Sequence, residues 1–116
     1  MKLRTTAEKA GFPITIQGSV IQVKTLSSSD FRRLKEKHTS VQRGVEKTNG
    51  LELTMDLFDR AVIGWDETIQ DENGEPIACT PANKRLICEH NMDFVNDVLA
   101  AIDDAEKARR TSAEGN

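Results

Sequence analysis

Two histidines and two cysteines are the residues of this chain best suited to chemistry, but their spacing matches no catalytic or metal-binding pattern. His38 and His90 lack partners at metal-ligand spacing, apart from Cys88 beside His90. Structural zinc needs four ligands, so this pair falls two short. A Cys–His nucleophile pair depends on the fold, and a free cysteine is more often core filling. Cys79 and Cys88 form no C-x-x-C pair, which favours reduced thiols in a cytosolic protein.

The acidic run from Asp71 to Glu75 suggests a calcium-binding loop, but the spacing of its residues excludes an EF-hand. With Gly74 as the loop glycine, Ile69 and Thr80 occupy the first and last ligand positions, where an EF-hand places carboxylates. The chain also contains no glycine-rich phosphate loop and no G-x-S-x-G. Enzyme candidates are therefore poor, and we expect no catalytic, metal-binding or cofactor-binding residue.

Charge is segregated along the chain. Residues 1–47 carry 10 Lys/Arg and 4 Asp/Glu, a net of +6, whereas residues 48–116 carry 6 and 15, a net of −9. Two interpretations stay open: the halves neutralise each other within one molecule, or the basic half of one copy meets the acidic half of the next. The cations of residues 32–47 also permit a small nucleic-acid-binding regulator, although no aromatic residue interleaves them and the chain is acidic overall.

The length of 116 residues predicts one domain with a mainly aliphatic core, since aromatic residues make up only 4%. No apolar run approaches the roughly 20 residues that span a membrane. The N-terminus has no apolar h-region, so we expect no secretory signal. The predicted fold class is α+β, mainly helical, with a short N-terminal antiparallel β-hairpin packed against about four helices.

The N-terminal half predicts a hairpin and a helix. Residues 1–13 are expected to be loosely ordered, with a helical turn at 6–10. Residues 14–23 alternate β-branched apolar residues on either side of Gly18-Ser19, which indicates a hairpin. Ser27 caps the next helix, with Asp30 completing a weak capping box and Leu26 and Phe31 forming a hydrophobic staple. That helix ends near residue 38, and residues 39–50 are expected to form a mobile loop that can include a few extended residues.

The C-terminal half predicts three helices around a strand–turn–strand segment. A helix over 54–63 carries an apolar stripe and stops at Gly64. Asn73-Gly74 marks the turn, and Thr80 with Pro81 starts a short helix over 81–89. Asn91 caps the last helix. The expected domain spans 14–110, followed by a disordered tail at 111–116.

The segment from Ile63 to Ile87 resembles the C-terminal half of the small tail assembly chaperones of long-tailed, siphovirus-type bacteriophages. That family tends to show a Trp, a short strand, an acidic Gly-Pro turn and a Ser/Thr-Pro-x-Asn helix start. The matching positions are Trp65, Ile69, Asp71, Gly74, Pro76, Thr80, Pro81, Asn83, Leu86 and Ile87. The start at residues 26–30 is similar too, so the resemblance covers roughly 14 to 103. Glu67 and Cys79 depart from it, since the family often has Gly and an aromatic residue there.

The resemblance implies a chaperone that binds the apolar, helical tape measure protein and keeps it soluble until tail tube subunits polymerise. It further implies a homo-oligomer in the cytoplasm of the infected bacterium, absent from the mature virion, with a longer frameshifted form contacting the tail tube protein. Membrane association is not expected. The alternative is a structural tail or connector component retained in the virion. The expected contact residues are Phe58, Val62, Trp65, Phe94, Val98 and Ile102.

Overall fold

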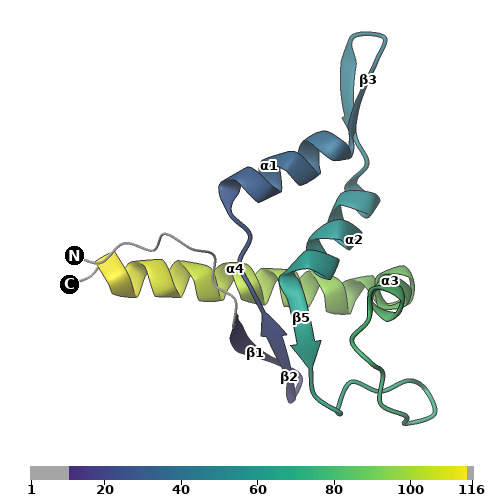
Figure 1. The fold of residues 1–116 in the computed structure, drawn as a ribbon, viewed down its shortest axis with the longest axis vertical. Coiled ribbons are helices and arrows are strands. Elements are labelled where there is room, and N and C mark those ends of the chain that lie inside the picture. The colour runs from purple at the N-terminus through teal and green to yellow at the C-terminus, as the bar shows by residue number, and fades with distance from the viewer. Residues whose placement is uncertain (1–10, 115–116) are drawn as a thin grey trace.

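The computed structural model describes residues 11–114, with side chains up to residue 108, as an α+β fold. Figure 1 shows its order along the chain. The strands are β1 (Phe12–Ile16), β2 (Ser19–Val23), β3 (Thr39–Gln42), β4 (Val45–Thr48) and β5 (Val62–Trp65). The helices are α1 (Ser28–Lys37), α2 (Gly50–Ala61), α3 (Pro81–His90) and α4 (Met92–Glu114). The predicted fold class is confirmed, whereas the helical turn expected at 6–10 lies outside the described residues.

The predicted N-terminal hairpin is confirmed and gains a third strand. β1 and β2 pair antiparallel from Phe12↔Val23 to Ile16↔Ser19, and β5 pairs antiparallel with β2 on its other side. The domain therefore starts before residue 14. The turn lies at Gln17-Gly18, one residue earlier than expected, and both residues have positive φ. β1 is an edge strand, which is where a strand tolerates Pro13.

The helix expected over 54–63 runs instead from Gly50 to Ala61, and the predicted stop at Gly64 is wrong. The Asn49 side chain accepts the Glu52 amide at 3.1 Å and caps the start. The end comes early because the β-branched residues at 62 and 63 continue as strand β5, which pairs with β2. Gly64 lies within that strand.

Residues 39–48, within the loop expected over 39–50, form a second hairpin, here called the arm, so the few extended residues expected there are two paired strands. β3 and β4 pair from Thr39↔Thr48 to Gln42↔Val45 around a two-residue turn at Arg43-Gly44. Both turn residues have positive φ, as the tight primed turns of hairpins require. Figure 1 shows the arm standing out from the body beyond α1 and α2.

The segment after Trp65 is a compact turn with little strand. Only one isolated bridge, Gln70↔Pro76, replaces the two short strands expected there. The predicted turn is present, with Gly74 at φ 78 and its amide bonded to the Asp71 carbonyl at 3.0 Å. Backbone amides from 73 and 75 bind the Asp71 carboxylate, and the Ile77 amide binds the Ile69 carbonyl at 2.9 Å, so these bonds hold the turn together.

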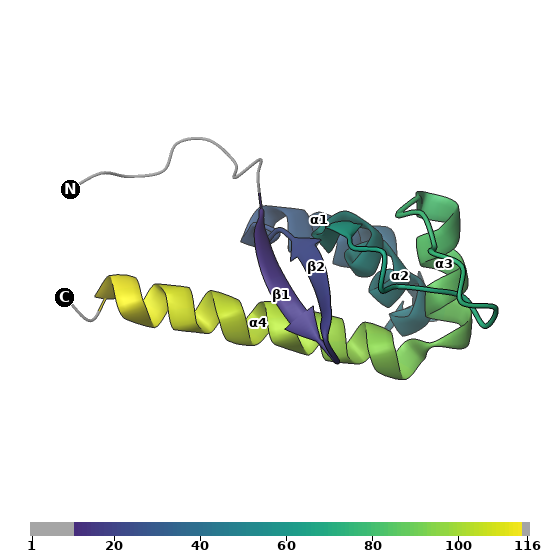
Figure 2. The ribbon, with the colours of Figure 1, turned by 90° about the horizontal axis from the view of Figure 1, so that it is seen from below.

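The starts of α1 and α3 are as predicted. Ser27 accepts the Asp30 amide at 3.1 Å, and Thr80 accepts the Asn83 amide at 3.2 Å with Pro81 in the first turn. α4 follows α3 directly and continues to Glu114, past the domain boundary expected at residue 110. Figure 2 shows α4 crossing one face of the sheet and running on beyond it. None of the described helices combines the length and apolarity needed to span a bilayer.

The core lies between the sheet, α2, α3 and α4. It is mainly aliphatic, as the composition predicted, and Phe58 is the largest fully buried side chain. Its buried members are Ile14, Ile21, Val23, Met55, Phe58, Ala61, Val62, Ile87, Cys88, Val95, Val98 and Ile102. α1 stands to one side of this core and buries only Leu34. Its position leaves an opening between α1 and α4, described next.

Candidate functional site

An apolar groove lies where α1, α2 and α4 approach one another, and it is here called the groove. Its volume is about 400 Å³. Leu57 and Ala61 come from α2, and Leu99 and Ile102 come from α4. Phe31 of α1 forms the opposite wall and stays 46% exposed. The groove thus offers aliphatic and aromatic surface contributed by three separate helices.

Charged side chains are confined to the ends of the groove lining. Lys24 stands before α1, while Asp103 and Glu106 follow the apolar residues of α4. Asp103 is paired with Lys107 at 3.1 Å, and both side chains are largely exposed, so this pair contributes little to stability. An apolar floor with an acidic edge suits an amphipathic helix that carries basic residues beside its apolar stripe.

Of the six predicted contact residues, the structure places three fully inside the core. Phe58, Val62 and Val98 are all 0% exposed, so a partner cannot touch them while the domain is folded. Ile102 is 9% exposed and does line the groove. The accessible apolar surface lies one helical position away, on Leu57 and Leu99.

The remaining two predicted residues, Trp65 and Phe94, are half-buried and away from the groove. The Trp65 indole donates to the Ile77 carbonyl at 2.6 Å, which ties the acidic turn to β5. Phe94 packs edge-on against Phe58, with ring centroids 6.5 Å apart. It also lines a separate hollow of about 390 Å³ beside β1, similar in volume to the groove. Both residues therefore help to hold the domain together and lie outside the groove.

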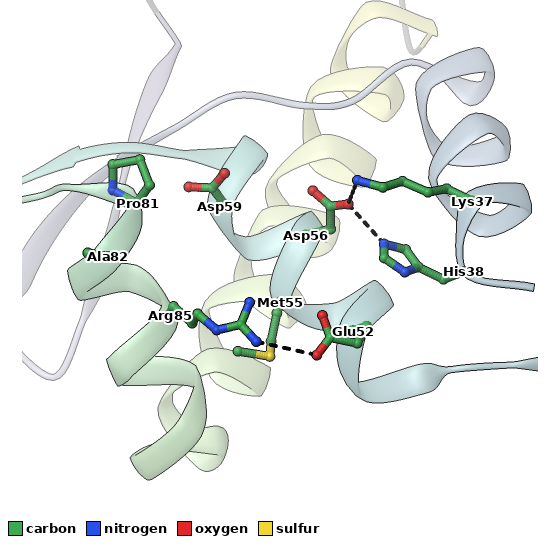
Figure 3. A pocket seen from close by; sticks show the side chains of 9 residues that line it. All are labelled: Lys37, His38, Glu52, Met55, Asp56, Asp59, Pro81, Ala82 and Arg85. Atoms are coloured by element: carbon green, nitrogen blue, oxygen red, sulfur yellow. Dashed lines mark hydrogen bonds and ion pairs between the residues drawn. The ribbon is translucent and has the colours of Figure 1, made fainter.

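A second, polar cleft lies between α2, α3 and the end of α1 (Figure 3). At one side the Asp56 carboxylate is 2.9 Å from the His38 ring and 3.3 Å from the Lys37 ammonium. Arg60 binds its other oxygen at 3.2 Å. Burial alone raises the pKa of Asp56, but hydrogen bonds from His38, Lys37 and Arg60 outweigh it, so the pKa lies below 3.8.

The described lining of the cleft contains paired charges but no side chain suited to act as a nucleophile. Its nine lining residues include no Ser, Thr or Cys, so the His38–Asp56 pair has no hydroxyl or thiol beside it to activate. Arg85 spans the other side and reaches Glu52 at 3.6 Å. The arrangement ties α1 and α3 to α2, and it also fixes residue 38, from which the arm starts.

Neither thiol has the environment of a reactive cysteine. Burial raises the pKa of Cys88 to about 11, and the nearby Asp59 charge adds to this effect. Burial also raises the pKa of Cys79. Reactive thiols need a lowered pKa and an electropositive setting. Among the described residues no three His, Cys, Asp or Glu side chains gather as a metal site would require.

Comparison of the chain with family models, with curated proteins and with solved structures found no significant match. The features that bear on function are consequently the groove and the sequence motifs that carry the resemblance. Sequence reasoning missed the groove because its walls come from residues near 31, 57 and 99. One local signal was available in the sequence. The predicted hydrophobic staple joins Leu26 and Phe31 at the helix start, and both residues line the groove.

Proposed function

We propose that this protein is a tail assembly chaperone of a long-tailed bacteriophage that binds the tape measure protein and keeps it soluble until tail tube polymerisation. The observation that carries the proposal is the groove, an open apolar surface on a small domain. Phe31 is 46% exposed on its wall although only five aromatic side chains exist in the chain. Exposed apolar patches of this kind mark interaction sites.

The bound segment in this proposal is an amphipathic helix of the tape measure protein. Three helices frame the groove, and a fourth helix laid along it would cover Phe31, Leu57 and Leu99 together. Basic residues flanking its apolar stripe would face Asp103 and Glu106 on α4. Several chaperone molecules along one long tape measure chain would add avidity to individually weak sites.

Further parts of the proposal follow from the same family resemblance. The protein acts in the cytoplasm of the infected host, is not an enzyme and leaves the assembly before the virion is complete. A longer frameshifted form would contact the tail tube protein. Mass spectrometry of purified virions tests this part: absence supports a chaperone, whereas stoichiometric presence favours a structural tail or connector component.

The central experiment is co-expression with the tape measure protein of the same genome, followed by a pull-down at 500 mM salt, a concentration that suppresses surface ion pairing. We expect the tape measure protein to become soluble and to co-purify. Phe31→Ser combined with Leu99→Ser should abolish capture. Leu51→Ser with Ile63→Ser is the matched control, since both apolar side chains are exposed and lie outside the groove. An insoluble tape measure protein beside a well-folded wild type contradicts the proposal.

A further inference from the structure

The arm projects from the body and buries no part of the described core. Every residue from 40 to 48 is exposed, and Val41 and Val45 are 68% and 57% exposed. A lone two-stranded hairpin is marginally stable in water. This one is nevertheless fixed at its base, where the Thr39 and Thr48 hydroxyls are 2.8 Å apart and the Asn49 amide binds the His38 carbonyl at 2.7 Å.

The two faces of the arm differ in charge. Side chains alternate along a strand, and the register pairs Gln42 with Val45 and Ser40 with Lys47. Val45 and Lys47 therefore share one face, and Arg43 adds a second cation at the tip. Neither cation pairs with a carboxylate within residues 11–108. This face thus combines an exposed apolar side chain with two cations that have no ion-pair partner in the described part of the chain.

The opposite end of the molecule carries the complementary surface. Residues 61–83 contain five Asp/Glu and no Lys or Arg. Their turn and α3 enclose a hollow of about 870 Å³, here called the acidic hollow. Glu72 lines it beside Leu86, which is 52% exposed. Glu72 and the adjacent Glu75 make no ion pair with any described residue.

We propose that the arm of one copy binds the acidic hollow of a second copy, with Val45 on Leu86 and with Arg43 and Lys47 against Glu72 and Glu75. In Figure 1 the arm and the turn after β5 stand at opposite ends of the long axis, which measures 48 Å. One copy thus cannot satisfy its own arm. A contact between two different surfaces repeats head to tail and builds a ring or an open filament.

This inference needs neither the groove nor a tape measure protein, so its test is separate from that of the proposed function. The experiment is sedimentation velocity of the purified chain over a range of concentrations at 50 mM and 500 mM salt. Two charge-reversed variants are compared with it: Arg43→Glu/Lys47→Glu on the arm and Glu72→Lys/Glu75→Lys at the hollow. Asp97→Lys/Asp104→Lys on exposed α4 positions is the control for net charge.

Wild type should associate with concentration at 50 mM salt, and high salt should weaken this association. Each charge-reversed variant should raise the dissociation constant roughly tenfold or more, as expected for removing and reversing complementary charges. An equimolar mixture of the two variants should associate again, because every arm then meets a hollow of opposite charge. The α4 control should behave like wild type.

Three results would overturn the proposal. The first is a wild type that stays monomeric at millimolar concentration in low salt. The second is a hollow variant that associates as wild type does while the arm variant does not, which indicates an arm-to-arm contact. The third is a mixture that fails to associate although circular dichroism shows both variants folded.

Discussion

The Lys84 ammonium group lies 3.2 Å from the Asp59 carboxylate and 2.8 Å from the main-chain carbonyl of the same residue. A third bond, also 2.8 Å, reaches the Val62 carbonyl. These carbonyls belong to the end of α2, where helices have acceptors without intrahelical donors and where a cation is favoured. Lys84 is the one buried charged residue among those described, at 8% exposure, and it fastens α3 to the junction of α2 and β5.

Replacing Lys84 with Met should destabilise the domain by roughly 2–4 kcal/mol, because two carbonyls at the end of α2 lose their donor. Urea unfolding followed by circular dichroism measures the change. Lys107→Met is the matched control: its ion pair with Asp103 is largely exposed, so its loss should stay below about 0.5 kcal/mol. Equal losses of unfolding free energy in the two variants would show that the buried Lys84 bonds stabilise the domain no more than the exposed ion pair of Lys107.

The lowered pKa of Asp56 predicts that the domain loses stability in acid. Its pKa lies below 3.8 in the folded protein, so the cluster with His38, Lys37 and Arg60 stabilises the fold above that pH. The contribution is lost as the pH falls through the folded value. Asp56→Asn should therefore destabilise by roughly 1–3 kcal/mol at pH 6, and the difference from wild type should shrink below about pH 4.

The measurement is urea unfolding of both proteins between pH 3 and pH 7. Asp104→Asn, on the exposed face of α4, is the control for removing one carboxylate. A difference between wild type and Asp56→Asn that stays constant across the whole range would mean that the substitution acts through packing and that the carboxylate charge is irrelevant.

The sequence predicted correctly the helices whose start depends on only a few adjacent residues. Ser27 with Asp30, and Thr80 with Pro81, cap their helices as expected because capping depends on bonds within one turn. The arm escaped prediction for the same reason. Its strands bury nothing, so no apolar alternation marks them, and its Arg43-Gly44 turn lacks the Asn or Asp that usually opens such turns.

The candidate site was harder to predict because it depends on which side of each helix the core covers. The sequence showed an apolar stripe through Phe58 on one helix and another through Val98 on the last helix, and either stripe could serve as core or as a contact surface. Leu57 and Leu99 are direct neighbours of those residues, yet they face the groove. Only the position of α1, set by contacts across the fold, decides which leucines remain accessible.

The thiols predict slow chemical modification of the native protein. The pKa of Cys88 is about 11 against an ordinary 9.0, so its thiolate population at pH 8 is roughly a hundredfold lower. A Cys79→Ser variant should therefore react with a disulfide reagent at least about a hundredfold faster in 6 M guanidinium than when native. Reaction of the native variant at the unfolded rate would place Cys88 at the surface.

The two tight turns should respond differently to the same substitution, because one lies in the core sheet and the other in the arm. Gln17 and Arg43 have φ values of 50° and 54°, a region that disfavours most side chains by about 1 kcal/mol and that Asn tolerates. Gln17→Asn should raise the unfolding free energy by about 0.5–1 kcal/mol, since β1 and β2 carry core residues.

Arg43→Asn should leave the global unfolding free energy unchanged within about 0.3 kcal/mol, because the arm opens without breaking the core. Its effect should appear instead as slower hydrogen exchange of arm amides, such as those of Ser40 and Lys47, which form a hydrogen-bonded pair of the ladder. If Arg43→Asn raised global stability as much as Gln17→Asn, the arm would have to fold and unfold together with the body. Measured on the Glu72→Lys/Glu75→Lys variant at low protein concentration, the exchange rates report on the arm with the proposed contact to a second copy weakened.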